Sequence, residues 1–258
     1  MTAQDIARKL PGIPTLRDRC RSMAMLDAIM QPDKPHLRRH AFDAHWSPGR
    51  VLASMDNGGG DTYSIVFSAA GAYVIGFDHT SPLNPCASDD EVPFPGVLDS
   101  VPEVFRSCVQ EPSFRLDDIS LVTACLWRET GDTAWRTGEV DPALGDDGAG
   151  WLFGMPAGGT PAAYADWAAY YFDAPVDLDA VQDVYELRPL TPELVGALNP
   201  AVTPERLADA VAGIGYPRAG QRTALCPRLF PACARRGGGT REPSRLSSRP
   251  APGSARSS

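Results

Sequence analysis

The sequence predicts an α+β fold, with an antiparallel β-meander sheet in the first half, helices packed on it from the second half, and a disordered basic C-terminal tail. Three observations predict it. Short β-type runs separated by Gly-rich turns fill residues 39–78, helix-cap signals recur between residues 160 and 216, and the composition changes abruptly after Pro217. We therefore expect a single acidic domain over residues 1–217 and a disordered tail over residues 218–258.

The first predicted elements are a helix and a strand. A helix over residues 16–30 is indicated by apolar residues at helical spacing, with Thr15 as its N-cap. Residues 39–46 then alternate, which predicts a half-buried strand that carries Phe42 and Trp46 on one face, together with His40 and Ala44.

The meander is the strongest structural signal. We expect strands over residues 51–55, 61–68 and 72–78, joined by turns at residues 56–60 and 69–71. Alternation places Tyr63, Ile65 and Phe67 on one face of the second of these strands. The spacing leaves no room for crossover helices, so the strands must be antiparallel.

The second half of the domain is predicted to be mainly helical. A short helix is expected over residues 99–108, and the apolar run 119–127 is expected to form the central strand of the sheet, with residues 133–137 as its partner. Helices are then predicted over residues 160–172 and 178–187, and after the pairs Thr191-Pro192 and Thr203-Pro204.

Charge and composition exclude several classes of function. Residues 1–217 contain 15 basic and 31 acidic residues, a net charge of −16. Such a domain repels phosphate backbones, so we expect no nucleic-acid binding by the domain itself. There is no signal peptide, no apolar run of membrane-spanning length and no C-x-x-C pair. These features predict a reduced, cytoplasmic protein without membrane association.

The tail has the opposite character. Residues 218–258 contain nine Arg and one acidic residue, Glu242, in a background of Pro, Ala, Gly and Ser. Such a segment cannot bury enough apolar surface to offset its ordering entropy. We prefer the hypothesis that it is an out-of-frame translation product of a GC-rich gene. A basic tail that binds nucleic acid or a membrane is the alternative.

One motif carries a resemblance to known proteins. The turn Asn57-Gly58-x-Gly60-Asp61-x-Tyr63, followed by Gly71 and by the segment 76–79 (Gly-Phe-Asp-His), is similar to a hairpin in a family of uncharacterised bacterial, especially actinobacterial, proteins. Trp46 and the segments 127–129 and 187–190 add to the resemblance, which covers most of residues 10–217. Gly59 stands where a Ser-like residue is expected, and the tail departs completely. The resemblance implies no chemistry.

Asp78 and His79 are the best candidates for catalysis. A carboxylate beside an imidazole can hold one tautomer of a side chain that titrates near neutrality. Asp61 or Tyr63 would lie near by, and the nucleophile would come from Ser64, Ser68, Cys86 or Cys125. No G-x-S-x-G elbow is present, and the alternative is that Asp78 caps a turn and His79 is a surface residue.

No metal or cofactor signature outweighs a structural explanation. The oxygens of Asp56, Asn57 and Asp61 suit calcium, but the spacing of a calcium loop is absent. Gly58–Gly60 is followed by a strand and not by a helix, so it does not match a phosphate loop. The carboxylates at residues 129, 132 and 139 have the chemistry of an acid–base pair, but nothing fixes their separation. We expect no cofactor and no metal.

We therefore predict a non-enzymatic binding domain that recognises a basic protein partner, as bacterial immunity proteins do. The candidates for the interaction are Trp46, Asn57, Trp127, Glu129 and Trp135. Trp127, Trp135 and Trp151 together are a candidate groove lining. The alternative function is a small hydrolase or transferase that uses Asp78 and His79.

Overall fold

A computed structural model describes residues 1–88 and 90–218 of the chain. Contacts divide the chain into two units, Met1–Gln221 and Arg222–Ser258, and the described residues all belong to the first. Apart from Arg218, the predicted basic tail lies outside the described residues.

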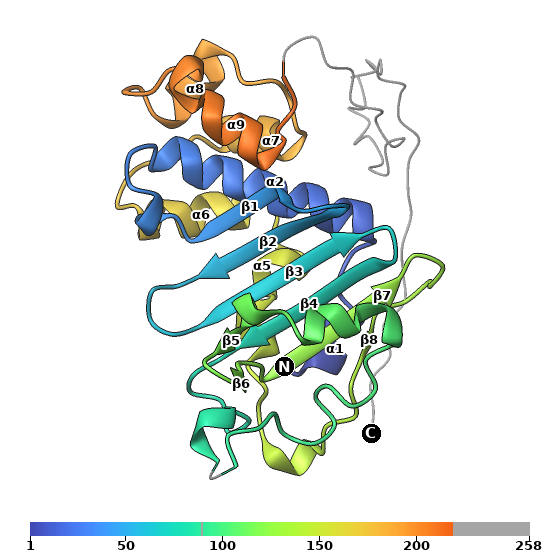
Figure 1. The fold of residues 1–258 in the computed structure, drawn as a ribbon. Coiled ribbons are helices and arrows are strands. Elements are labelled where there is room, and N and C mark those ends of the chain that lie inside the picture. Colours follow the sequence, from blue (N-terminus) through green and yellow to red (C-terminus); the bar gives the residue numbers. More distant parts are fainter. Residues whose placement is uncertain (89, 219–258) are drawn as a thin grey trace, which may run out of the picture. The chain divides into compact units, whose positions relative to one another are not determined.

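An antiparallel sheet of six strands forms the centre of the first unit (Figure 1). The strand order is β1-β2-β3-β4-β7-β8, and every neighbouring pair is antiparallel. The strands are β1 (His40–Ser47), β2 (Arg50–Asp56), β3 (Thr62–Ser68), β4 (Gly71–Phe77), β7 (Ala124–Glu129) and β8 (Arg136–Thr137). A separate two-stranded ribbon consists of β5 (Arg115–Leu116) and β6 (Ile119–Ser120).

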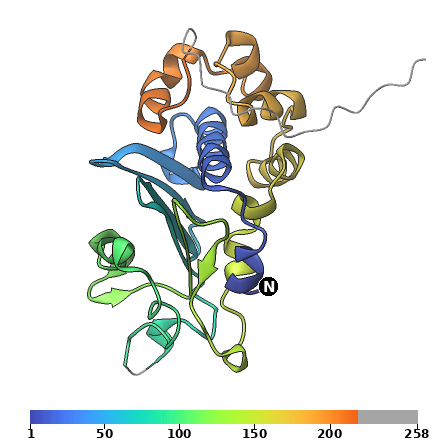
Figure 2. The same ribbon diagram turned by 90° about the vertical axis from the view of Figure 1, so that its right-hand side faces the viewer.

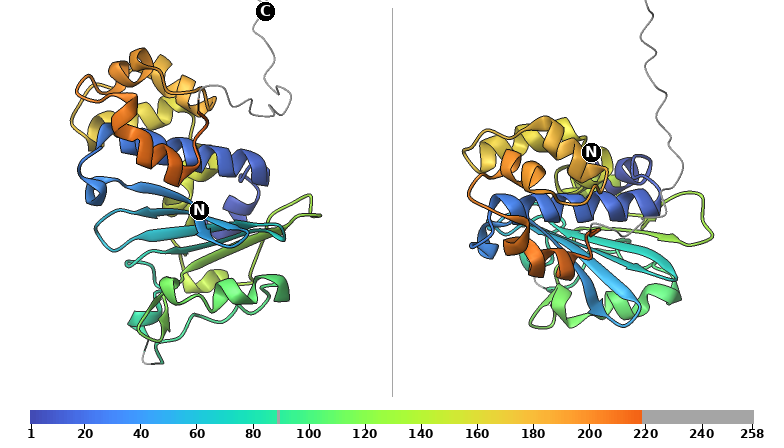
Figure 3. Two further views of the ribbon diagram at one scale, coloured as in Figure 1. Left: turned by 45° about the horizontal axis from the view of Figure 1, so that its top comes forward. Right: turned by 90° about the horizontal axis from the view of Figure 1, so that it is seen from above.

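Helices cover one face of this sheet, and the segment between β4 and β7 covers the other (Figure 2). The helices on the first face are α1 (Ala3–Ala7), α2 (Ile13–Met30), α4 (Ala149–Leu152), α5 (Gly154–Gly158), α6 (Pro161–Tyr171), α7 (Leu178–Tyr185), α8 (Pro192–Leu198) and α9 (Ala208–Ile214), whereas the short helix α3 (Arg106–Val109) belongs to the segment that covers the other face. Both α2 and α9 pack against β1, the strand at one edge of the sheet (Figure 3).

Two hydrophobic cores lie on the two faces. The helix-side core contains Tyr63, Ile65 and Phe67 from β3, as the predicted alternation requires. The loop-side core contains Val66 from the same strand and Phe105 from the covering segment. The α+β fold class and the three-stranded meander β2-β3-β4 are confirmed.

The predicted caps also form. Thr160, Asp177 and Thr191 each accept a hydrogen bond from a backbone N–H three residues on, at the starts of α6, α7 and α8. The element after Thr203 begins as a 3₁₀ turn over Pro204–Leu207 and continues as α9, which ends at Gly215 in the left-handed conformation.

Three predictions were wrong in detail. Helix α2 begins at Ile13, because Pro14 occupies its first turn and Gly12 is the N-cap in place of Thr15. The apolar run 119–127 divides into β6 and β7, and β7 lies between β4 and β8 and not at the centre of the sheet.

The third correction concerns Trp46. The register of β1 against β2 shifts between Asp43 and Ser47. As a result Phe42 and Ala44 contact the helix-side core, whereas Trp46 contacts the loop-side core, where it stacks on Phe114. Between Asp43 and Ser47 β1 takes four residue steps where β2 takes two, from Leu52 to Arg50, so the regular alternation of faces is broken there.

None of the helices in residues 1–88 and 90–218 is long and apolar enough to span a bilayer.

Candidate functional site

Asp61 and His79 meet where the loop before β3 lies beside the loop after β4. The Nδ1 atom of His79 is 2.7 Å from Oδ1 of Asp61, and the backbone N–H of His79 donates to the same oxygen. An ionised carboxylate can only accept, so Nδ1 of His79 is the donor in this hydrogen bond. The side chain of His79 is 49% exposed, whereas that of Asp61 is only 10% exposed.

The carboxylate of Asp61 accepts from two further side chains. Nδ2 of Asn57 donates to Oδ2 at 2.7 Å, and Nε1 of Trp151 donates to the same atom at 3.2 Å. Burial by itself would raise the pKa of Asp61, but the hydrogen bonds from His79 and Trp151 outweigh it and lower the pKa. Asp61 is therefore held as an ion that fixes the positions of its neighbours.

The glycine-rich turn is shaped to admit the His79 ring. Gly60 has φ of +106°, and a Cβ atom there would lie 3.3 Å from the ring. Asn57 Oδ1 accepts from the backbone N–H groups of Gly59 and Asp61, and Asp56 Oδ1 accepts from that of Gly58. These oxygens are used in turn hydrogen bonds, which is the structural alternative to calcium ligation.

Asp78 caps a turn and is not the carboxylate that contacts the His79 ring. Its Oδ1 accepts from the N–H and the hydroxyl of Thr80, so it caps the turn that follows β4. The possible ligand atoms of Asp61, Asp78 and His79 lie within 4.8 Å of one another. Because both oxygens of Asp61 already accept hydrogen bonds, hydrogen bonding accounts for this cluster without an ion.

The other catalytic candidates lie elsewhere. Tyr63 points to the helix-side core, where it packs on Phe153, and burial raises the pKa of its hydroxyl. Cys125 lies in the loop-side core, and burial raises the pKa of its thiol to about 12. A cavity on the sheet face and another between α2, β1 and α9 are both lined by residues other than Asp61 and His79.

The predicted tryptophan groove is not formed. Trp127 is 3% exposed in the loop-side core, and Trp135 is 6% exposed in the helix-side core, where its Nε1 donates to the carbonyl of Pro11. Tryptophan is enriched both in cores and at interfaces, so the sequence alone could not tell a buried tryptophan from one at an interface. Glu129 is exposed at the end of β7, and Trp151 is 56% exposed.

Trp151 begins a row of side chains joined by cation–π and stacking contacts, which consists of Trp151, Arg39, Trp167 and Tyr171. The guanidinium carbon of Arg39 is 5.0 Å from the centre of the Trp151 ring and 5.7 Å from that of Trp167. Trp167 in turn stacks on Tyr171 at 5.0 Å. The row connects the Asp61–His79 pair to the surface of α6.

A buried hydrogen-bond network centred on Asp27 lies next to this row. Asp27 of α2 is fully buried, and its carboxylate accepts from the backbone N–H groups of Arg39 and His40 and from the hydroxyl of Tyr164. The ring of His40 contacts that of Trp167 edge-on. Sequence reasoning missed this network, although Asp27 lies four residues after Met23 on the apolar face of its helix, where a charged residue is a signal.

Comparison with known proteins finds no family model, no curated protein and no solved structure that matches this chain, so the resemblance of its glycine-rich hairpin to an actinobacterial family stays a prediction.

Proposed function

We propose that this chain is a non-enzymatic, cytoplasmic binding domain that recognises a basic protein partner, in the manner of an immunity protein, through a surface on α6 and α7. This acidic aromatic surface consists of Asp166, Tyr170, Tyr171, Asp173, Asp177, Leu178 and Asp179, all of them exposed. The observation that carries the proposal is Tyr170, which is 89% exposed among these carboxylates.

The chain segment that contains Tyr170 carries charge of one sign only. No Lys, Arg or His occurs between Arg136 and Arg188. The acidic residues in the same stretch are Glu139, Asp141, Asp146, Asp147, Asp166, Asp173, Asp177, Asp179, Asp183 and Glu186. Carboxylates concentrated in this way accelerate encounter with a basic surface and repel an acidic one.

The aromatic side chains supply what charge alone cannot. Exposed Tyr and Trp residues bury a large area at little entropic cost, and they are enriched among the residues that dominate binding energy. Tyr171 is held in place by its stacking on Trp167, so this part of the surface is ordered before a partner arrives. Leu178 at the start of α7 adds an exposed apolar side chain, and α6 and α7 pack against each other.

The proposal is tested by site-specific photo-crosslinking in the native host. A photoreactive phenylalanine replaces Tyr170, and in a matched control it replaces Leu116, which is exposed on the ribbon at the other face of the sheet. We expect the Tyr170 position alone to capture one basic protein. Binding of that protein should weaken with added salt and with Tyr170→Ala. Equal capture from both positions, or binding that neither salt nor Tyr170→Ala weakens, would contradict the proposal. A toxin gene beside this gene would support the immunity-like role.

A second candidate function, a small hydrolase or transferase, is favoured by one observation, the 2.7 Å contact between Asp61 and His79. In it the free Nε2 of His79 would act as a general base, while Asp61 holds the tautomer. Turnover should then be lost in His79→Gln, which keeps a hydrogen-bond donor but cannot take up a proton. A panel of ester, amide and phosphoester substrates on which the protein and His79→Gln give the same rates would remove this candidate.

A further inference from the structure

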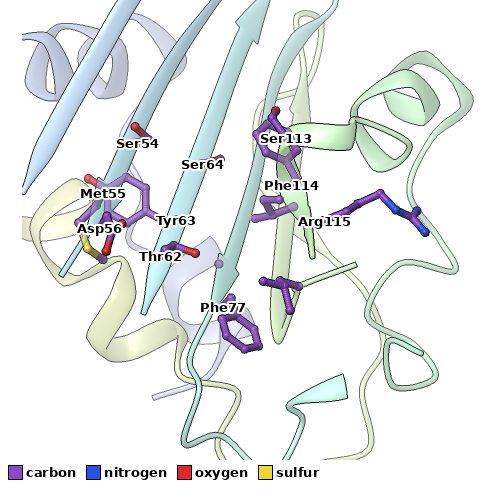
Figure 4. Close-up of a pocket in the computed structure, with 13 residues that line it drawn as sticks. Ser54, Met55, Asp56, Thr62, Tyr63, Ser64, Phe77, Ser113, Phe114 and Arg115 are labelled. Atoms are coloured by element: carbon purple, nitrogen blue, oxygen red, sulfur yellow. The ribbon is translucent and has the colours of Figure 1, made fainter. Parts of the chain in front are cut away.

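The face of the sheet opposite the helices carries a hollow that the loop-side core does not fill (Figure 4). Its floor is formed by β2, β3 and β4, and its wall by the 3₁₀ turn Pro112–Phe114 and by Leu121. The hollow has a volume of about 310 Å³, at the lower end of the range of roughly 300–1,000 Å³ in which small-molecule sites fall.

Hydroxyl groups line the floor. Ser54 of β2 and Ser64 of β3 are direct cross-strand partners, and Thr62 follows on the same face of β3. Further along the same two strands this face is apolar, since Leu52 and Val66 contact the loop-side core. Within residues 1–88 and 90–218 the hydroxyls of Ser54, Thr62 and Ser64 have no hydrogen-bond partner, so their donors and acceptors are available to a ligand.

The walls add apolar surface on rigid elements. Phe77 of β4 is the cross-strand partner of Thr62, and Ile75 is that of Ser64. Phe114 closes the side of the hollow and is fixed by a stacked contact with Trp46 at 5.9 Å. A ligand would therefore meet hydroxyl groups on one side and aromatic or aliphatic side chains on the other.

Within the described part of the chain the hollow contains no cationic group, and the two charged lining residues each make hydrogen bonds outside it. The carboxylate of Asp56 accepts from the backbone N–H of Gly58 in the turn beyond β2. The side chain of Arg115 points away from the strands (Figure 4), and its guanidinium donates to the hydroxyl of Ser120 and to the carbonyl of Asp118. An anionic ligand would lose water here without gaining a counter-charge, which favours an uncharged ligand over an anionic one.

We propose that this hollow binds a small uncharged molecule with several hydroxyl groups along one edge and an apolar face, of the size of a monosaccharide. Ser54, Thr62 and Ser64 would hydrogen-bond to the hydroxyls, and Phe77 and Phe114 would contact the apolar face. The site lies on the opposite face of the sheet from the helix-side core to which α6 and α7 contribute, so it does not depend on the proposed partner surface.

The test is a titration of the isotope-labelled full chain followed by amide chemical shifts. The probes are glucose, galactose and N-acetylglucosamine, with glucuronate as a charged counterpart and cyclohexanol as a counterpart with a single hydroxyl. We expect at least one neutral sugar to shift the amides of Ser54, Ser64 and Leu121 saturably. Glucuronate and cyclohexanol should bind at least about tenfold more weakly.

Two variants and a control separate the hollow from other sites. Ser64→Leu fills the hollow and should abolish these shifts, whereas Ser64→Ala should weaken binding by several-fold. Ser100→Leu, which makes the same change at an exposed position outside the hollow, should bind like the unchanged protein. The inference is overturned if none of the neutral sugars shifts these amides at millimolar concentration. It is also overturned if the charged or apolar counterpart binds as tightly, or if Ser64→Ala binds like the unchanged chain.

Discussion

The buried carboxylate of Asp27 accepts hydrogen bonds from distant parts of the chain, although it lies in a largely apolar helix. Its donors come from the start of β1 and from α6. We expect Asp27→Ala to destabilise the fold by about 3 kcal/mol or more, because it leaves several buried donors without an acceptor. Urea unfolding measures this. The matched control is Asp18→Ala on the same helix, which removes a partly exposed pair with Arg21 and should cost less than about 1 kcal/mol. Similar losses in the two variants would show that the Asp27 network contributes little.

The ionisation of Asp61 makes the stability of the fold depend on pH. Its pKa is lowered in the folded state, so the ionised carboxylate stabilises the fold above its unfolded pKa, and this contribution is lost as the pH falls toward the folded value. We therefore expect Asp61→Asn to be less stable than the unchanged protein near pH 7, and the difference to shrink below about pH 4. Urea midpoints at a series of pH values measure it. A difference that stays constant over this range would exclude the ionic contribution.

At the scale of elements, the threonine caps offer a built-in comparison. The hydroxyls of Thr160 and Thr191 accept from backbone N–H groups of α6 and α8, whereas that of Thr203 makes no cap hydrogen bond. We expect Thr160→Ala and Thr191→Ala each to cost about 1 kcal/mol, and Thr203→Ala to cost clearly less. Thermal unfolding of the three variants provides the measurement, and an equal effect of all three would show that the cap bonds are not the cause.

The helices and strands also show which features can be predicted from residues that are close in sequence. The strands β2, β3 and β4 and the starts of α6, α7 and α8 were predictable, because their signals depend on residues within about four positions of one another. The reversal of Trp46 was not predictable, because the bulge in β1 depends on how Asp43–Ser47 pairs with β2. The same holds for Trp127 and Trp135, whose burial depends on segments that cover the sheet from far along the chain.

At the scale of the whole molecule, the charge of residues 1–217 governs the response to salt. With 31 acidic and 15 basic residues, the folded domain repels itself more than the expanded chain does. We expect the urea midpoint of the domain to rise as sodium chloride increases from low to physiological concentration, because salt screens this repulsion. A midpoint that falls over this range would mean that the ion pairs contribute more than the net charge does.

By itself the sequence determined the α+β class, the meander, most helix starts and the contrast between an acidic domain and a basic tail. All of these follow from composition or from interactions between near neighbours in the chain. The register of the β3–β4 hairpin already brings Asp61 near His79, but only the tertiary structure brought Trp151 to Asp61 across 90 positions and Tyr164 to Asp27 across 137. Such contacts arise when separate elements pack on a common sheet, and the local periodicity of a single sequence does not encode which elements will meet.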